Sequence, residues 1–190
     1  MLFTTTSSRE EIWAIVNKEF QLASKETQHP FRFVNLCTLD GNQPDSRYVV
    51  LREVTEDLQL LFYTDSRSKK ITQIMENPKV SLLFYHSSER CQVKINGIAT
   101  ILAPKEATDN YWENISTEGH RAYQSKKPPK TEVETAEEGM ILNVKYKNDY
   151  FSVIKVVPNE VECLQLGSKG HLKHAFKKET EKWQSSWLVP

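Results

Sequence analysis

The sequence predicts a mainly β fold of the α+β class, in which antiparallel strands close into a barrel and helices lie outside it. Two observations lead to this prediction. Strand-like runs are numerous and few helical segments separate them. The dipeptide Asp40-Gly41, which lies between two such runs, is a signal for a β-hairpin turn. Together they favour a closed antiparallel barrel over alternating layers of strands and helices.

Length and composition limit the class of protein. With 190 residues, 38% hydrophobic and 26% charged, the chain is expected to form one domain over residues 1–190. Basic and acidic residues number 25 each, so the net charge of zero gives no long-range attraction to nucleic acid. The first residues lack a signal-peptide pattern, and no apolar run approaches the roughly 18 residues of a membrane span. We therefore expect a cytoplasmic protein without membrane partners.

The first elements are a helix and a series of strands. A serine at position 7 or 8, followed three residues later by a glutamate, makes a capping box. Apolar residues at helical spacing then predict an amphipathic helix over residues 9–24, and Pro30 stops its continuation. Strands are expected over residues 31–39, 46–54, 58–64, 80–85 and 92–102, with a bulge at Gly97 in the last.

Short helices and a loop complete the middle of the chain. A helix is expected over residues 68–77, with an inner face formed by Ile71, Ile74 and Met75. Pro104 suits the first turn of a helix running to about residue 116. A further short helix is expected at residues 121–125, followed by a surface loop over residues 126–139, which are rich in proline, lysine and glutamate.

The end of the chain predicts two or three more strands. Residues 150–157 and 161–166 are expected to form a hairpin around Pro158-Asn159. A last strand is expected near residues 172–176. A tail that carries Trp183 and Trp187 follows it.

The start of the helix at residues 68–77 is suited to an anion. Ser68, Lys69 and Lys70 place a hydroxyl group, two ammonium groups and the free backbone N–H groups of a helix N-terminus at one point. Thr64, at the end of the preceding strand, adds a second hydroxyl group. The alternative is that Lys69 and Lys70 are ordinary solvated surface lysines.

Arg47 and Arg52 flank an apolar run at residues 49–51. A guanidinium group can contact two phosphate oxygens at once. In a regular strand, a separation of five residues puts these two side chains on opposite faces. Either a bulge or strong twist brings both to one ligand, or only one of them binds it. The alternative is a pair of arginines exposed at the rim of the sheet.

Gln92 begins the strand that follows these groups. Its amide can donate and accept at once, so it matches the alternating N–H and C=O edge of a flavin ring. Cationic and hydroxyl side chains at the ends of three strand-like runs, followed by this amide, suit a compact dianion attached to a flat ring. Flavin mononucleotide (FMN) is such a molecule.

The same segments resemble the pyridoxamine 5'-phosphate oxidase-like family of FMN-binding split barrels. The resemblance covers roughly residues 30–102 and extends more weakly to the end of the chain. The run TDSRSKK is most similar to the shorter, oxidase-related branch of the family. The matching pieces are Arg47-Tyr48-Val49-Val50-Leu51-Arg52, Phe62-Tyr63-Thr64, Ser68-Lys69-Lys70, the run NPKVSLLF and Gln92-Val93.

The resemblance implies an antiparallel FMN-binding split β-barrel and a homodimer. Two FMN sites would lie at the subunit interface, each using residues from both chains. Arg47, Lys69 and Lys70 would hold the phosphate, with Arg67 as an alternative to Lys69. Arg52 would lie near the flavin ring or the substrate. The implied cofactor-binding residues are Arg47, Val49, Val50, Leu51, Arg52, Tyr63, Thr64, Ser68, Lys69, Lys70 and Gln92.

An FMN-dependent oxidoreductase with a small-molecule substrate of unknown identity is therefore expected. One alternative is a true pyridoxamine 5'-phosphate oxidase. The other is a non-catalytic flavin- or haem-binding protein of storage, sensing or stress response. The first alternative is weakened because the family's Arg-x-His-x-Arg run near the C-terminus is replaced by residues 171–175, HLKHA. No side chain is identified as a general base.

No metal site is expected. His171 and His174 have the H-x-x-H spacing of metal or haem ligands, but no third ligand is evident. Solvated loop histidines are the preferred interpretation, and His86 carries no signal of its own. Three widely spaced cysteines form no CxxC pair and are expected to be buried thiols; they are Cys37, Cys91 and Cys163.

Overall fold

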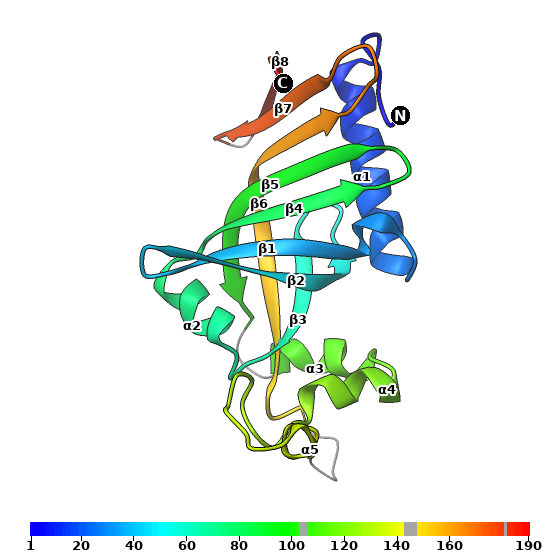
Figure 1. Ribbon diagram of the computed structural model, residues 1–190. Helices are drawn as coiled ribbons and strands as arrows, with labels where there is room; N and C mark the ends of the chain where they lie inside the picture. The colour runs from blue at the N-terminus through cyan, green and yellow to red at the C-terminus, as the bar shows by residue number, and fades with distance from the viewer. Residues whose placement is uncertain (103–105, 143–147, 181) are drawn as a thin grey trace.

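The computed structural model describes residues 1–102, 106–142, 148–180 and 182–190 (Figure 1). Its strands are β1 (Phe33–Asp40), β2 (Gln43–Val54), β3 (Leu60–Asp65), β4 (Lys79–His86), β5 (Cys91–Ile101), β6 (Phe151–Gln165), β7 (Leu172–Glu179) and β8 (Lys182–Leu188). Its helices are α1 (Arg9–Lys25), α2 (Lys69–Glu76), α3 (Glu106–Glu113), α4 (Thr117–His120) and α5 (Ala136–Gly139), with 3-10 turns at Pro30–Arg32 and Arg121–Tyr123. Among these residues, no helix is both long and apolar enough to cross a membrane.

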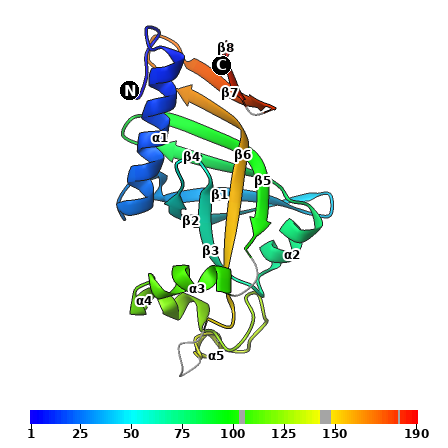
Figure 2. The same cartoon turned by 180° about the vertical axis from the view of Figure 1, so that it is seen from behind.

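The strands form one antiparallel sheet that closes on itself. Their order is β3-β2-β1-β4-β5-β6-β7-β8, and an additional pairing of β3 with β6 closes the first six strands into a barrel. This confirms the antiparallel barrel expected from the sequence. β7 and β8 extend the sheet beyond the closure, and Figure 2 shows β6 spanning the height of the barrel.

The predicted hairpin around Pro158-Asn159 is wrong, because residues Phe151–Gln165 form one uninterrupted strand. β6 pairs with β3 through residues 151–156 and with β7 through residues 160–165. Pro158 lies between these two segments, where neither β3 nor β7 requires a backbone N–H from it. The predicted tail also differs, since Trp183 and Trp187 belong to a further strand, β8, that pairs with β7.

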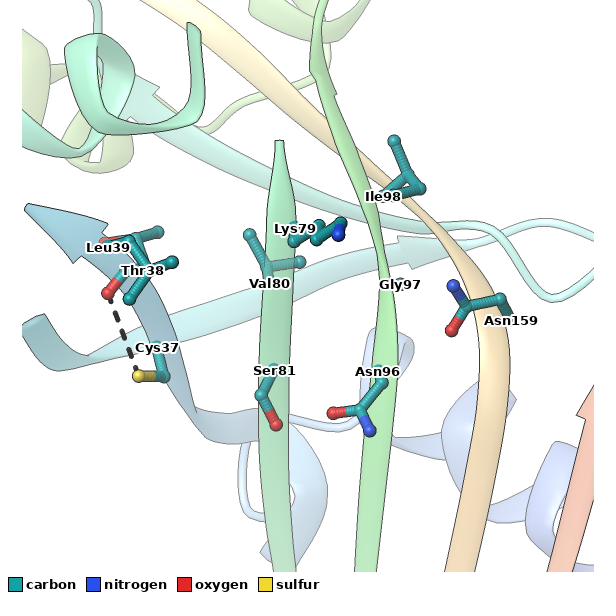
Figure 3. Close-up of a pocket in the computed structure, with 10 residues that line it drawn as sticks. All are labelled: Cys37, Thr38, Leu39, Lys79, Val80, Ser81, Asn96, Gly97, Ile98 and Asn159. Carbon is teal, nitrogen blue, oxygen red and sulfur yellow. Dashed lines mark hydrogen bonds between the residues drawn. The ribbon is translucent and has the colours of Figure 1, made fainter. Parts of the chain in front are cut away.

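A bulge between β5 and β6 opens a hollow on the outer face of the sheet. The register shifts at Gly97, as the sequence predicts, and Asn159 is the extra residue on β6. A Cβ atom on Gly97 would lie 2.6 Å from the carbonyl oxygen of Val157, so this close approach requires glycine. The hollow has a volume of about 340 Å³ and is lined by residues of β1, β4, β5 and β6 (Figure 3).

α1 packs its apolar face on the barrel and confirms the predicted N-terminal helix. The capping box is formed, because Glu11 N–H donates to Ser8 Oγ and Ser8 N–H donates to the Glu11 carboxylate. Ile12, Val16 and Phe20 are fully buried. Burial of each such side chain contributes roughly 1.5–3 kcal/mol, and this contribution fixes α1 against the sheet.

Other short elements match with local differences. α2 confirms the helix predicted at residues 68–77, but its inner face is formed by Ile71, Gln73 and Ile74. The assignment of Met75 to that face was wrong, since this side chain is 75% exposed. The start of the helix predicted at Pro104 lies outside the described residues, and α3 is described from Glu106 onward. α4 and the turn Arg121–Tyr123 stand in place of the single short helix predicted at residues 121–125, and α5 interrupts the predicted loop 126–139.

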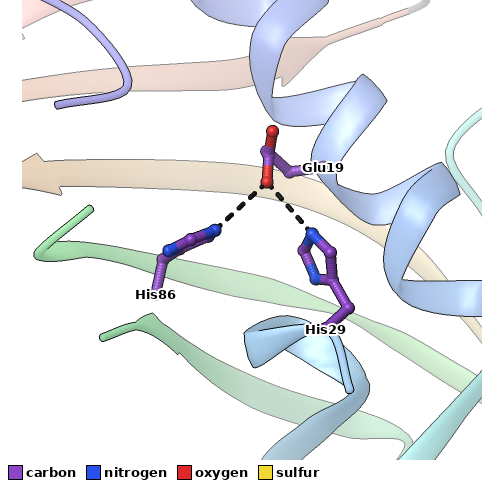
Figure 4. A group of neighbouring side chains, drawn as sticks. All are labelled: Glu19, His29 and His86. Carbon is purple, nitrogen blue, oxygen red and sulfur yellow. Dashed lines mark hydrogen bonds and ion pairs between the residues drawn. The ribbon is translucent and has the colours of Figure 1, made fainter. Parts of the chain in front are cut away.

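Glu19, His29 and His86 connect α1 to the segments before β1 and at the end of β4 (Figure 4). The Nε2 atoms of His29 and His86 lie 3.1 and 3.3 Å from the same carboxylate oxygen of Glu19. Their side chains are 6% and 10% exposed, so His86 is part of a buried network that the sequence analysis did not predict.

The hydrogen bonds of this network define the proton positions. His29 Nδ1 accepts from the backbone N–H of Phe31, and His86 Nδ1 accepts from the backbone N–H of Glu89, each at 3.2 Å. These acceptor roles put the His29 proton on Nε2, which donates to Glu19, and His86 Nε2 lies 3.3 Å from the same oxygen. A metal ion would need the Nε2 lone pair and would force each remaining proton against a backbone N–H. The geometry thus suits hydrogen bonding and does not suit a cation.

We expect Glu19→Ala to lower the free energy of unfolding by about 1–3 kcal/mol, because the buried Nε2–H of His29 loses its acceptor and His86 loses the neighbouring carboxylate. Chemical denaturation measures this change. Glu26→Ala, at an exposed position just after α1, is the control and should change stability by about 0.5 kcal/mol or less. Equal effects of the two substitutions would show that the network does not stabilise the fold.

Candidate functional site

Three of the predicted site residues contact one another beside the N-terminus of α2, and Arg47 lies near them. Lys70 Nζ donates to Thr64 Oγ1 at 3.0 Å and to Ser68 Oγ at 3.1 Å. The two hydroxyl oxygens lie 3.2 Å apart. Arg47 lies near this group on β2: burial lowers the pKa of Lys70, and the positive charge of Arg47 lowers it further. Arg47, Thr64, Ser68 and Lys70 are called the cradle below.

The local sequence explains why the cradle forms here. β3 ends at Asp65, and the backbone N–H of Ser68 donates to the Asp65 carbonyl in the turn that starts α2. Ser68 is the N-cap residue, but its side chain makes no capping hydrogen bond. The first N–H groups of α2 consequently lack a side-chain acceptor, and the Ser68 hydroxyl remains directed at Lys70. A helix start of this kind favours negative charge.

Arg47 is held at the rim of the cradle by polar groups of β1, β2 and α2. Its Nη1 donates to Thr38 Oγ1 at 2.5 Å, and its Nη2 donates to Gln73 Oε1 at 3.0 Å. Nη2 also lies 2.7 Å from a carboxylate oxygen of Asp45. Gln73 Nε2 donates to that same oxygen at 2.9 Å. These contacts fix the guanidinium group in one orientation.

The cradle carries positive charge that its own residues do not neutralise. Burial lowers the pKa of Lys70, and the neighbouring charge of Arg47 lowers it further. In the described part of the chain, the hydrogen-bond partners of Lys70 Nζ are hydroxyl groups and no carboxylate pairs with it. Because the charged ammonium is destabilised by folding, a bound anion would stabilise it.

Two other basic residues of the same segment point elsewhere. Lys69 Nζ forms an ion pair with Asp40 on the exposed surface. Arg67 contacts both carboxylate oxygens of Asp65, donates to the Ser125 carbonyl at 2.8 Å and lies over the ring of Tyr150. Successive helical residues point about 100° apart, and here Lys69 points toward Asp40 whereas Lys70 points toward Thr64 and Ser68. Neither Lys69 nor Arg67 is part of the cradle in this chain.

Arg52 lies at a bulge but does not reach the cradle. The register of β2 and β3 passes from Leu51↔Phe62 to Glu53↔Leu61, which leaves Arg52 as the extra residue. The bulge considered from the sequence is therefore present. However, the Arg52 guanidinium lies 5.6 Å from the centre of the Tyr63 ring. Tyr63 faces the opposite side of β3 from Thr64.

Tyr63 and Arg52 border a second, aromatic cluster. The Tyr63 ring contacts the rings of Tyr111 and Phe151, with centroids 6.0 and 5.2 Å apart. Burial raises the pKa of Tyr63 to about 12, so the phenol stays protonated at neutral pH. Arg52 Nε is buried without a hydrogen-bond partner among the described residues.

The remaining predicted residues are divided between the two faces of the sheet. Val49 and Leu51 face inward with Arg47, whereas Val50 alternates to the outer face. Gln92 also faces outward, at the end of β5 that adjoins the turn from β4. α2 lies on the other side of the barrel from this turn (Figure 1). A single chain does not bring Gln92 to the cradle.

Sequence analysis missed three polar residues around the cradle. Asp45 and Gln73 contact Arg47 directly, and Lys130 Nζ lies 3.9 Å from the Asp45 carboxylate. Gln73 could have been found from its position three residues after Lys70, which places both on one helical face. The position of Lys130 near the cradle could not be predicted, because this residue lies in the segment that was expected to be a charged surface loop.

The histidines near the C-terminus were partly misassigned. His174 lies on β7, is 3% exposed and contacts the rings of Phe176 and Trp187. The interpretation as a solvated loop residue was wrong for it, since pairing with β8 covers its ring. Burial lowers the pKa of His174. His171 is exposed just before the strand, in agreement with the loop interpretation.

Comparison with known proteins identifies the family. Residues 12–103 match the family model described as pyridoxamine 5'-phosphate oxidase, FMN-binding domain. The pyridoxine/pyridoxamine 5'-phosphate oxidase of Pelagibacter ubique is 30% identical over 170 residues, covering 82% of this chain and 80% of that protein. The enzyme of the same name from Granulibacter bethesdensis is 30% identical over 164 residues, covering 77% and 75%.

Two solved structures share the fold over nearly the whole chain. A pyridoxamine 5'-phosphate oxidase-related, FMN-binding protein from Nostoc punctiforme superposes with a TM-score of 0.77 at 21% identity, covering 99% of this chain and 100% of that one. PhzG from Burkholderia lata, solved with tetrahydrophenazine-1-carboxylic acid, gives a TM-score of 0.77 at 19% identity, covering 100% and 98%. The fold is that of an FMN-binding split barrel.

The donors of the cradle fit the dianionic end of such a cofactor: a guanidinium group, a half-buried ammonium group, two hydroxyl groups and an uncapped helix start. The residues matched by the family model include every member of the cradle. The chain belongs to the pyridoxamine 5'-phosphate oxidase-like family of FMN-binding split-barrel proteins, and its cofactor is FMN.

Proposed function

We propose that the cradle binds the phosphate group of FMN. The observation that carries this proposal is Lys70, a half-buried ammonium group whose partners are hydroxyl groups and which pairs with no carboxylate among the residues that the structure describes. Thr64 and Ser68 direct it toward the uncapped start of α2, and Arg47 adds a second positive charge. A phosphate at this point would accept hydrogen bonds from both cations and from free backbone N–H groups.

The other predicted contacts would surround the rest of the cofactor. Val49, Val50 and Leu51 lie between Arg47 and Arg52 on β2, so their backbone would border a molecule that extends from the cradle along this strand. Arg52 and Tyr63 would then meet the ring or the substrate on the other side of β3. Lys69 would have to release Asp40 before it could contribute to phosphate binding.

We also propose a homodimer that completes the site. The outer face of β1, β2, β4 and β5 exposes a series of large apolar side chains, and contiguous apolar surface of this kind marks interaction sites. They are Phe33 (57% exposed), Tyr48 (74%), Leu83 (41%), Tyr85 (48%) and Ile98 (37%). Gln92 lies on the same face and away from the cradle of its own chain. In a dimer formed through this face, Gln92 would contact the FMN bound at the site of the partner subunit.

The proposed activity is oxidation or reduction of a small molecule in the cytoplasm. Bound FMN supplies two-electron redox chemistry. The residues of this chain would bind the phosphate, orient the ring through Arg52 and Gln92, and exclude water with the aromatic cluster beside Tyr63. No described side chain is assigned as a general base.

Oxidation of pyridoxamine 5'-phosphate is a second candidate, because the relatives carry the name of that activity. The segment that replaces the family's Arg-x-His-x-Arg run does not favour it. Lys173 forms an ion pair with Glu162 at 2.9 Å, and His174 is buried beneath Trp187. Neither side chain is available to a substrate phosphate in this arrangement. A non-catalytic flavin-binding role is the third candidate.

Two measurements on purified protein distinguish these candidates. The absorption spectrum and the mass of the released small molecule should identify FMN. Peroxide release is then followed after addition of pyridoxamine 5'-phosphate, and flavin bleaching after addition of reduced nicotinamide nucleotides. Turnover of pyridoxamine 5'-phosphate would show that this compound is a substrate and would overturn our ranking of this activity as the second candidate. A flavin that none of these compounds reduces would favour the non-catalytic role.

We expect Lys70→Glu to weaken FMN binding at least tenfold. Loss of a charge-assisted hydrogen bond costs about 1.5–3 kcal/mol, and the new carboxylate repels the phosphate. Fluorescence titration of the flavin-free protein measures the dissociation constant. Lys18→Glu on the exposed side of α1 makes the same change in net charge and should leave the constant within about twofold. An unchanged constant for Lys70→Glu would remove Lys70 from the phosphate site.

We expect Leu83→Glu to shift the protein from dimer to monomer, because it puts a charge in the middle of the outer face. Sedimentation velocity at micromolar concentration measures the shift, and flavin titration should show weaker FMN binding. Met140→Glu, at a 72% exposed apolar residue away from the sheet, is the control and should change neither. A wild-type protein that binds FMN as a monomer would contradict the proposed dimer.

A further inference from the structure

Arg47 has few hydrogen atoms left for a ligand. Its Nη1 donates to the Leu36 carbonyl at 3.4 Å and to Thr38 Oγ1 at 2.5 Å. Its Nη2 donates to Gln73 Oε1 at 3.0 Å and faces Asp45 Oδ2 at 2.7 Å. Each of these nitrogens carries two hydrogens, so the four contacts occupy both nitrogens. A phosphate that engages them must replace one of the four acceptors.

Asp45 is the acceptor that a phosphate can replace most easily. Leu36 and Thr38 are fixed in β1, where both are buried, and Gln73 is 1% exposed on the inner face of α2. The Asp45 side chain is 28% exposed and lies at the open edge of the group. Asp45 is also the only charged group of these four acceptors, so the position that its carboxylate occupies already accommodates a negative charge.

The charged groups around Asp45 come from three elements. Arg47 faces it from β2, Lys70 lies on α2, and Lys130 approaches within 3.9 Å from the segment before α5. The other nearby carboxylate, Asp65, is held by Arg67 through both of its oxygens. Asp45 is therefore the carboxylate that balances the cradle in the described part of the chain.

We propose that Asp45 is a built-in counter-anion of the cradle that competes with the cofactor phosphate and so weakens FMN binding. This inference rests on the proposed role of the cradle. When no phosphate is bound, the Asp45 carboxylate neutralises Arg47 and Lys130. When a phosphate dianion enters, the carboxylate is displaced from Arg47 and remains as a nearby like charge. The chain thereby holds its cofactor less tightly than the same set of cations would allow.

Asp45→Asn tests the proposal because it removes the charge and keeps the shape. The asparagine oxygen can still accept from Gln73, so the orientation of the α2 side chain is preserved. At a separation of about 6 Å, loss of the like charge should tighten FMN binding roughly 3- to 20-fold. Riboflavin, which has the ring but no phosphate, should bind equally well to both proteins. The probes are FMN and riboflavin, titrated into flavin-free full-length protein by fluorescence.

Glu76→Gln is the matched control. It removes one carboxylate from the exposed end of α2, the helix that carries Lys70, and in the described part of the chain this carboxylate forms no ion pair with Arg47. Its effect on the FMN dissociation constant should be smaller than about twofold. Thermal unfolding gives a second readout: flavin-free Asp45→Asn should melt below wild type, and FMN should raise its melting temperature by a larger amount.

The outcomes separate this inference from the proposed function. If wild type binds FMN no better than riboflavin, the cradle does not hold the phosphate and both proposals fail. If wild type prefers FMN to riboflavin but Asp45→Asn binds FMN as tightly as wild type or more weakly, the proposed phosphate site is supported and Asp45 only positions Arg47. Equal tightening by Glu76→Gln would show that net charge alone causes the effect, and it would also overturn the role of Asp45.

Discussion

The pairing of β3 with β6 is the constraint on which the rest of this structure depends. Six consecutive residues of β3 pair with β6, from Leu60↔Val156 to Asp65↔Phe151. This ladder closes the barrel and ends where β3 gives way to the turn before α2. Because β3 is also paired with β2, the closure brings Thr64 and the start of α2 to the side of the sheet where Arg47 projects. The cradle is a consequence of barrel closure.

The chemistry of the cradle follows from where closure puts its charges. A lysine at the second position of a helix would normally extend into water, but Lys70 is half-buried against two hydroxyl groups. Burial and the charge of Arg47 both lower its pKa. Folding therefore destabilises the charged form of Lys70. In the proposed function, a dianionic phosphate would offset this destabilisation and so connect cofactor binding to the stability of the barrel.

Local signals in the sequence predicted much of the fold. The capping box at Ser8 and the hairpin turn at Gly41 each depend on residues that are neighbours in the chain. The wrong predictions concern residues whose structure depends on partners far along the chain. Pro158 was assigned to a turn, although the gap between two pairing segments of β6 tolerates it.

Part of the geometry around the proposed site was predicted from the sequence. The motif indicated that Arg47, Thr64, Ser68 and Lys70 lie in one region; in the structure Lys70 contacts Thr64 and Ser68, and Arg47 lies near them. Sequence order alone could not separate Lys70 from Lys69, because their directions depend on where α2 begins. Sequence order also could not reveal that the Asp45 carboxylate contacts the guanidinium group of Arg47.

A crystal structure of the flavin-loaded protein tests the central claim most directly. The account requires the FMN phosphate to lie within hydrogen-bond distance of Lys70 Nζ, at the start of α2, with Arg47 beside it. A phosphate bound at another point, for example beside Lys173 on β7, would contradict the account even if the fold and the cofactor were correct.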